Sequence, residues 1–282
     1  MKDIDGQKRI AVLIDADNAQ YSKIKAVLSE ISTHGRIITK RAYGDWSSPN
    51  LKNWKDSLND YSIQPIQQFA YTTGKNSTDA SMIIDAMDLL YTDKYDSFVL
   101  VSSDCDFTKL ASRLRESEKF VFGVGEAKTP MSFRNACDDF ILVENLDKEV
   151  HKAERKRDTS HKKTVNAKPN IKERIPEVIK EPVIVETVEA DTSSLDGVIE
   201  LLDIAAENYG NEDGWTNVSS AGTYIKRSMP DFDPRTYGFI KLPDLIKSLS
   251  SIYEIRRFSG KGTVTIVAYK RKDNAPLSEL SP

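Results

Sequence analysis

Acidic residues cluster at three places in the first half of the chain, and their types suit metal-dependent chemistry. Asp15 and Asn18 stand in the segment IDADN, and Asp104 and Asp106 stand in SSDCDF. Asp79 lies between these segments, directly after GKNST. Each of the two outer segments follows a short apolar run that is typical of a buried strand. We therefore expect these acids to meet at one edge of a parallel sheet.

Several carboxylates that converge need a compensating charge. Two unit charges about 4 Å apart repel by roughly 4 kcal/mol at an effective dielectric constant of about 20. A divalent cation removes this cost, and oxygen ligands select Mg²⁺ or Mn²⁺ rather than zinc. Metals held in this way activate water and stabilise the leaving oxygen in phosphodiester hydrolysis. The pattern therefore predicts a Mg²⁺ or Mn²⁺ site made of Asp15, Asp79, Asp104 and Asp106.

Each of these acids also has a simpler structural interpretation. An aspartate at the end of a strand is often a turn former or a helix cap, and Asp106 could cap the helix after it. Asp79 could be an acid that the helix dipole favours in a first turn. Lys75 fits a phosphate contact and an ordinary loop lysine equally well. Asp85 and Asp88 lie off the apolar stripe of their helix, which predicts solvent-exposed charges.

Alternating strand-like and helix-like segments in residues 1–149 must position the acids. The strand patterns occupy residues 10–14, 36–42, 63–69, 97–101, 119–123 and 141–143. The helix patterns occupy residues 22–33, 51–58, 80–91 and 108–115. The apolar stripe of the third helix consists of Ala80, Ile83, Ile84, Met87, Leu90 and Tyr91. This alternation favours an α/β fold with a Rossmann-like parallel sheet and helices on both faces.

The chain changes character twice beyond residue 149. Residues 150–192 contain three prolines and no Phe, Trp or Tyr, a composition that predicts a flexible charged linker. Residues 193–272 show three helix patterns followed by two strand patterns around the turn sequence SGKG. This is the layout of a small winged helix-turn-helix domain. Residues 273–282 are predicted to form a tail.

The charge and cysteine content narrow the functional classes. The 282 residues include 40 Lys and Arg against 43 Asp and Glu, a formal net charge of −3. This balance excludes a histone-like basic protein but not a local nucleic-acid-binding surface. Two cysteines are too few for a disulfide framework, and the three histidines lie outside the acidic motifs. No apolar run has the length of a membrane span or a signal peptide, which predicts a soluble, cytoplasmic protein.

Four motifs in the first segment, taken in order, resemble those of one family. IDADN, YGDW, GKNSTDASMIIDAMDLL and SSDCDF are similar to the NYN domain, a branch of the PIN-like ribonucleases, over residues 8–147. The resemblance implies a PIN-like α/β/α sandwich that cleaves RNA with clustered aspartates and Mg²⁺ or Mn²⁺. It implies catalytic and metal-binding roles for the four aspartates, and for Asn18 the orientation of a water or phosphate at the metal. Cys105 departs from the small residue, often glycine, that is usual between the last two acids.

The segment from Gly214 to Arg257 resembles a LOTUS domain, also called OST-HTH. Its most specific part is YGFIKL, from Tyr237 to Leu242. The resemblance implies a winged helix that binds RNA and in some members contacts proteins, so a protein partner stays open. The basic residues expected to contact RNA phosphates are Lys75, Lys226, Arg227, Arg235, Lys241, Arg256, Arg257 and Lys261. The alternative is that these bases only solvate the fold. The residues expected in the core of this domain are Trp215, Tyr237 and Phe239.

These observations predict a metal-dependent ribonuclease whose LOTUS domain recruits RNA, with single-stranded RNA as the expected partner. The alternative from another class is an RNA-binding or scaffolding regulator with weak catalysis. A third interpretation is a haloacid-dehalogenase-like phosphatase with Asp15 as nucleophile, because a DxD sequence follows the first strand. That fold also requires a lysine and a separate acidic motif, and Ala19 stands where it usually has Thr or Val. Oligomeric state and the choice between Mg²⁺ and Mn²⁺ stay open.

Overall fold

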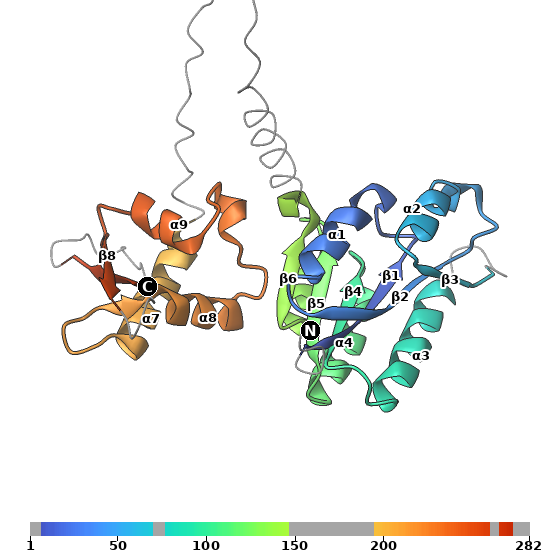
Figure 1. Cartoon of the computed structure of the whole chain (residues 1–282), viewed down its shortest axis with the longest axis horizontal. Helices are drawn as coiled ribbons and strands as arrows, with labels where there is room; N and C mark the ends of the chain where they lie inside the picture. The colour runs from blue at the N-terminus through green and yellow to red at the C-terminus, as the bar shows by residue number, and fades with distance from the viewer. Residues whose placement is uncertain (1–6, 70–76, 147–194, 260–264, 273–282) are drawn as a thin grey trace, which may run out of the picture.

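The computed structural model describes residues 7–69, 77–146, 195–259 and 265–272 (Figure 1). Within these ranges the chain forms a large α/β region up to residue 146 and a smaller region from residue 195. The predicted linker over residues 150–192 and the predicted tail over residues 273–282 lie outside the described residues. Among the residues described, no helix combines the length and the apolar character that crossing a bilayer requires.

A six-stranded parallel sheet forms the centre of the first region. Its strands are β1 (Arg9–Asp15), β2 (Arg36–Gly44), β3 (Gln64–Gln67), β4 (Ser97–Val101), β5 (Phe120–Gly125) and β6 (Asp139–Leu142). The strand order is β3-β2-β1-β4-β5-β6, and every neighbouring pair is parallel. The order reverses between β1 and β4, where open parallel sheets bind ligands beyond the carboxyl ends of their strands. The predicted Rossmann-like sheet is confirmed.

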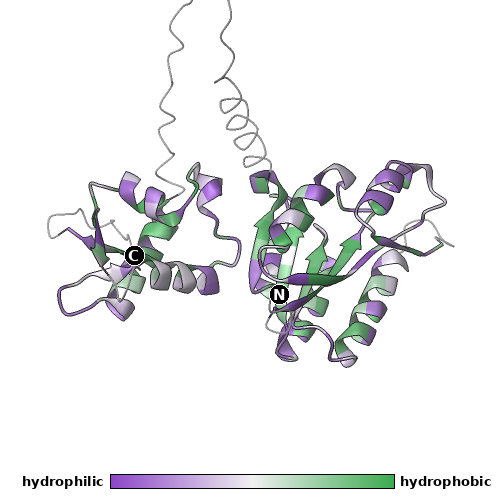
Figure 2. Cartoon of the chain, in the orientation of Figure 1, coloured by the Kyte–Doolittle hydropathy of each residue, from purple (hydrophilic) through white to green (hydrophobic). Residues whose placement is uncertain are grey.

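Helices cover both faces of this sheet. The helices α1 (Ile24–Ile31) and α2 (Trp54–Asp60) lie on one face, and α3 (Ser77–Tyr91) and α4 (Thr108–Glu116) lie on the other (Figure 1). Alternate residues of β1 enter two separate cores: Leu13 packs with the α3 and α4 side chains, whereas Ile14 packs with those of α1. Burial on both faces explains why β1 and β4 are continuous apolar runs, which are green in Figure 2.

Two short elements differ from the sequence prediction. The helix expected over residues 51–58 is a 3₁₀ turn (Pro49–Leu51) followed by α2. A helix that was not predicted, α5 (Met131–Ala136), joins β5 to β6 and contributes Phe133 to the core on the α3 side. A helix of this length spans less than two turns, so it shows no apolar period that sequence reasoning can detect.

The buried face of α3 also differs from the predicted stripe. Ala80 is exposed, and Ile84 and Tyr91 are 63% and 72% exposed, so the part of the prediction that placed these three residues in the core is wrong. The helix instead buries Met82, Ala86 and, in its first turn, Asp79. The residues that do contact the core as predicted are Ile83, Met87 and Leu90. The same helix carries Asp85, whose polar contacts with β2 are described below.

The C-terminal region is a winged helix, as predicted. It contains α7 (Asp196–Tyr209), α8 (Val218–Ser228), α9 (Leu242–Ser248), β7 (Thr216–Asn217), β8 (Tyr253–Ser259) and β9 (Thr265–Arg271). The strands form an antiparallel sheet in the order β7-β9-β8. The helices and the sheet share a core that includes Leu202, Ile225, Leu245 and Tyr269. The strand β7 was not predicted because two residues carry no alternation pattern.

One of the three aromatic residues expected in this core lies elsewhere. Tyr237 and Phe239 pack against the core. Trp215 is half-buried at the edge of the small sheet, where its ring meets that of Phe258 with centroids 5.3 Å apart. The Arg256 guanidinium lies 4.9 Å from the centroid of the same ring. Trp215 therefore belongs to the surface of the wing and not to the core.

Candidate active site

The carboxyl ends of β1 and β4 bring two acidic motifs together. Asp15 is the last residue of β1, and β4 ends three residues before Asp104. The two strands are paired, with Ile14 opposite Val101. The motifs therefore meet where the strand order of the sheet reverses, as the sequence predicts.

Asp15 is fully buried and held by four hydrogen bonds. Its Oδ1 accepts from the backbone nitrogens of Asp17 at 3.2 Å and Asn18 at 3.3 Å. Its Oδ2 accepts from Asn18 Nδ2 at 2.9 Å and from Ser102 Oγ at 2.7 Å. Burial raises the pKa of Asp15 above its usual value, while the hydrogen bonds from Asn18 and Ser102 oppose this rise. The protein thus fixes this carboxylate in a single orientation.

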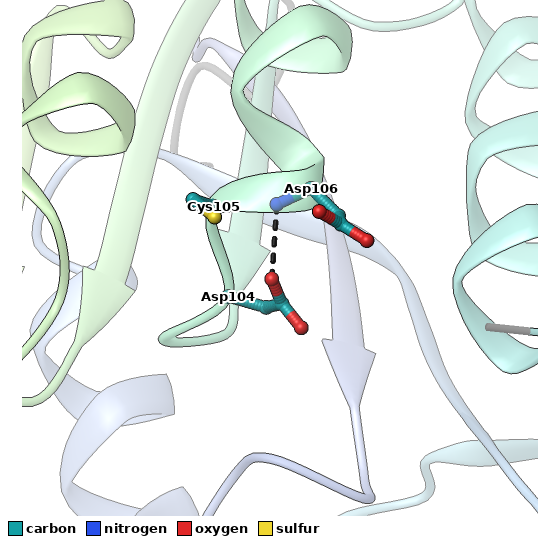
Figure 3. A group of neighbouring side chains, drawn as sticks. All are labelled: Asp104, Cys105 and Asp106. Carbon is teal, nitrogen blue, oxygen red and sulfur yellow. Dashed lines mark hydrogen bonds between the residues drawn. The ribbon is translucent and has the colours of Figure 1, made fainter. Parts of the chain in front are cut away.

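Ser102 connects the first acidic motif to the last. Its buried hydroxyl donates to Asp15 and also accepts from the backbone nitrogen of Asp104 at 3.0 Å. Asp104 Oδ1 in turn accepts from the backbone nitrogen of Asp106 at 3.0 Å (Figure 3). The residue that caps the 3₁₀ turn Cys105–Phe107 is therefore Asp104, whereas the carboxylate of Asp106 lies on the exposed side of that turn. Sequence reasoning missed Ser102, although the SSDCDF motif contains it.

Asp79 brings a further carboxylate to the same edge from the first turn of α3. Its side chain is nearly buried, with 9% of the residue exposed. The pKa of Asp79 is raised to about 6, first by burial and then by the charges of Asp15, Asp104, Asp106 and Asp17. Like charges act in this way only at short range. The structure thus gathers the four predicted acids and adds Asp17, whose place in IDADN was the available signal.

The position of Asp79 depends on a polar contact in the middle of α3. Asp85 accepts hydrogen bonds from the Arg41 guanidinium and the Tyr43 hydroxyl, both on β2. Burial raises the pKa of Tyr43, so its hydroxyl stays protonated and continues to donate. The prediction that Asp85 is a solvent-exposed charge is wrong. Asp85 attaches α3 to the sheet and thereby holds Asp79 near the other acids.

The donor atoms at this edge suit a hard divalent cation. Among the described residues, Asp104, Cys105 and Asp106 form a group whose potential ligand atoms lie within 4.8 Å of one another (Figure 3). Asp15 and Asp79 add carboxylates from β1 and α3. Mg²⁺ and Mn²⁺ prefer such oxygen ligands, whereas the exposed thiol of Cys105 suits softer metals. The residues present therefore fit the Mg²⁺ or Mn²⁺ site that the sequence predicts.

The basic residues expected to contact RNA fall into three groups. Lys75 and Lys261 lie outside the described residues. The exposed residues of the winged helix are Arg227, Lys241, Arg256 and Arg257. Arg256 among them forms an ion pair with Glu254 at 2.6 Å. The remaining two bases, Lys226 and Arg235, form ion pairs with Asp139 and Glu30 of the α/β region.

The phosphatase interpretation is not supported by the environment of Asp15. A phosphatase nucleophile must reach a phosphorus atom with a carboxylate oxygen. Asp15 is fully buried, and both of its oxygens accept hydrogen bonds from Asn18 or Ser102.

The fold and the acids define a class of protein. It has a parallel α/β domain with acids clustered where the strand order reverses, followed by a winged helix. The NYN domain family matches residues 9–144, and the OST-HTH/LOTUS domain family matches residues 171–265. The chain therefore contains an NYN domain followed by an OST-HTH domain. This pair of domains combines a nuclease type of fold with an RNA-binding type of fold.

Individual proteins are similar to parts of this chain. The uncharacterized protein MJ0482 from Methanocaldococcus jannaschii is 27% identical over 167 residues, which are 54% of this chain and 62% of that protein. The match thus spans about three fifths of that relative's length. The structure of VPA0982, a protein of unknown function from Vibrio parahaemolyticus, matches with a TM-score of 0.41 and 19% identity over 50% of this chain and 95% of its own. An uncharacterized protein from gene locus NE0665 of Nitrosomonas europaea matches with a TM-score of 0.26 and 20% identity over 41% of this chain and 97% of its own.

Proposed function

We propose that this protein is a divalent-metal-dependent ribonuclease whose NYN domain cuts RNA and whose OST-HTH domain recruits it. The observation that carries the proposal is the meeting of carboxylates from three separate elements at one switch point. Asp15 comes from the end of β1, Asp79 from α3, and Asp104 from the turn after β4. The charges of the neighbouring acids contribute to the raised pKa of Asp79, and a divalent cation would offset this repulsion.

The proposed roles of the residues follow from their contacts. The residues that would hold Mg²⁺ or Mn²⁺ are Asp15, Asp79, Asp104 and Asp106. Such a cation, when bound, supplies the positive charge that activates water and stabilises the leaving oxygen of a phosphodiester. Ser102 and Asn18 hold Asp15 in place, and the hydrogen bond within the 3₁₀ turn holds Asp104. Because Asn18 donates its side-chain amide to Asp15, we assign it the positioning of that carboxylate alongside the orientation of a water or phosphate.

RNA recruitment is assigned to exposed bases of the winged helix. Arg227, Lys241 and Arg257 are exposed in the structure. Contacts of this kind with phosphates add affinity without selecting a sequence, and they weaken steeply as salt rises. Single-stranded RNA remains the substrate that we propose.

A cleavage assay tests the proposal directly. Labelled single-stranded RNA, duplex RNA and single-stranded DNA are incubated with the full chain in Mg²⁺, in Mn²⁺ and in EDTA. We expect metal-dependent cleavage of single-stranded RNA, which Asp104→Asn reduces to the EDTA background. The matched control is Asp88→Asn, because Asp88 is an exposed acid on α3 and the same charge is removed. Circular dichroism verifies that both variants are folded.

Three outcomes separate the alternatives. Unchanged cleavage by Asp104→Asn contradicts the assignment of the site. Equal losses in Asp104→Asn and Asp88→Asn would show that net charge matters and that the position of the acid does not. RNA binding without cleavage in either metal would favour the second candidate, an RNA-binding or scaffolding regulator.

A further inference from the structure

The winged helix contacts the NYN domain at the edge of its sheet. Among the described strands, β6 is the last in the sheet order and pairs with β5 alone. The backbone nitrogen of Phe140, in β6, donates to the backbone oxygen of Pro230 at 3.0 Å. Pro230 belongs to the segment directly after α8, which Figure 1 shows close to β6. An unpaired strand edge favours unwanted pairing with other chains, and the winged helix covers part of this edge.

A nearly buried ion pair stabilises this contact. Arg134 of α5 and Asp231 of the winged helix approach to 2.9 Å, and their side chains are only 12% and 14% exposed. Arg134 also donates from Nε to the backbone oxygen of Thr129 at 2.8 Å, which fixes the orientation of its guanidinium. Asp231 Oδ1 is buried without a hydrogen-bond partner among the described residues. The carboxylate of Asp231 therefore depends on Arg134 for its compensation.

Two further ion pairs have their bases on the winged helix and their acids on the NYN domain. Lys226 of α8 pairs with Asp139, the first residue of β6. Arg235 lies 3.5 Å from Glu30 of α1, and its guanidinium also pairs at 2.7 Å with Asp233 of the winged helix itself. Asn145 Nδ2 adds a hydrogen bond to Thr236 Oγ1 at 2.9 Å. The two surfaces are therefore complementary in charge over three separate elements of the NYN domain.

We propose that this contact is a docking interface within the chain, and that RNA phosphates compete with it for Lys226 and Arg235. The competition rests on the proposed function, because it requires that the winged helix bind RNA. Lys226 and Arg235 belong to the basic set that the sequence assigns to phosphate contacts, yet in the structure they contact carboxylates. While Asp139 holds Lys226, that base is not available to a phosphate, and Arg235 faces Glu30 in addition to its partner Asp233 in the winged helix. RNA binding through these bases therefore requires that the winged helix leave the β6 edge.

The fraction of molecules in the docked state sets how far the interface weakens RNA binding. If only the undocked fraction binds RNA through these bases, the apparent dissociation constant rises by the reciprocal of that fraction. An interface that is docked about nine-tenths of the time weakens RNA binding by about tenfold. Removal of the acids on the NYN side should therefore strengthen RNA binding, even though neither acid touches RNA.

The first experiment tests docking without RNA. Small-angle X-ray scattering of the full chain in low salt should fit the docked arrangement. Asp139→Lys should increase the radius of gyration, because Lys226 then faces a like charge. The charge-swapped double variant Asp139→Lys/Lys226→Asp should return the radius of gyration toward the wild-type value. Wild-type scattering that requires separated domains, or a double variant as extended as the single variant, would overturn the docking interface.

The second experiment tests the competition with a labelled single-stranded RNA. We expect Asp139→Asn/Glu30→Gln to lower the dissociation constant by about tenfold. The control Asp88→Asn/Glu116→Gln removes the same two charges from exposed positions of the NYN domain, at α3 and α4, and should change it much less. Equal affinities for the two double variants would refute the competition. If no protein binds RNA, the RNA function and the competition both fail, while the scattering result still decides the docking interface.

Discussion

Carboxylates gather at the carboxyl ends of β1 and β4, whereas opposite charges pair at the edge beside β6. The first cluster contains Asp15, Asp17, Asp79, Asp104 and Asp106. Burial, together with the charges of the other four acids, raises the pKa of Asp79 to about 6. The second cluster contains the pairs Arg134–Asp231, Lys226–Asp139 and Arg235–Glu30. The two clusters lie in one molecule, but like charges dominate the first, whereas each acid of the second is paired with a base.

The difference in charge pairing between the two clusters indicates what each cluster binds. Like charges held together oppose folding, so a protein that keeps them has a use for a cation from outside. Opposite charges that already pair need no ligand, but each base can exchange its carboxylate for another anion. The acid site is therefore expected to respond to divalent metal, and the interface is expected to respond to RNA and to salt.

The largest effect should come from Ser102→Ala, which breaks the acid site without removing an acid. The variant loses the hydroxyl that donates to Asp15 and accepts from the Asp104 backbone. Groups that orient metal ligands typically contribute about 10- to 100-fold to metal affinity or activity, and we expect a loss of that size. Mn²⁺ titration by calorimetry and the cleavage rate at saturating RNA measure the two effects.

The neighbouring serine provides the control for this prediction. Ser103 Oγ accepts from the backbone nitrogen of Glu126 at 3.0 Å and does not contact the acids in the described hydrogen bonds. Ser103→Ala should therefore keep metal affinity within a few-fold of wild type. Equal losses in the two variants would mean that the turn as a whole, rather than the Ser102 hydroxyl, positions the acids.

The sequence could predict that the acids meet at one edge of the sheet because their placement is local. A buried apolar strand followed directly by an acid defines the end of β1, and the same pattern defines the end of β4. The alternation of strands and helices then implies the sheet order and its switch point. Ser102 was missed because a serine acquires its role only when burial and the two strand ends place it between Asp15 and Asp104.

The interface was not predicted because its partners are distant in the chain. Lys226 and Asp139 are 87 residues apart, and Arg235 and Glu30 are 205 apart. Residue type alone indicated phosphate contacts for both bases, since an exposed lysine and a paired lysine look the same in sequence. The prediction for α3 was wrong for a related reason: the contacts of Asp85 with Arg41 and Tyr43 join two elements that are distant in sequence.

A second prediction compares one acid from each cluster in metal-free protein. A raised carboxyl pKa means that ionisation opposes folding, so Asp79→Asn should stabilise the chain in EDTA by about 1–2 kcal/mol after allowance for solvent screening. Asp139→Asn should instead destabilise it by about 0.5–1 kcal/mol, because Lys226 loses its partner. Urea unfolding in EDTA measures both changes, and Mn²⁺ should stabilise wild type and Asp139→Asn but not Asp79→Asn. A loss of stability in Asp79→Asn without metal would contradict the idea that the acids repel one another.

The smallest expected effect is the response of the acid site to monovalent salt. The variant Asp139→Asn/Glu30→Gln reduces the contribution of the interface, because it removes two of its three ion pairs. Raising NaCl from about 0.05 M to about 0.5 M in EDTA shortens the screening length to below about 5 Å, which weakens the repulsion among the acids. We expect a gain of a few tenths of a kcal/mol, or about 1 °C in Tm. Adding Asp79→Asn to this background should remove most of the gain, because it takes one charge out of the cluster. A Tm that falls with salt in both proteins would mean that the acids are compensated inside the chain, and the acid site would then resemble the interface instead of contrasting with it.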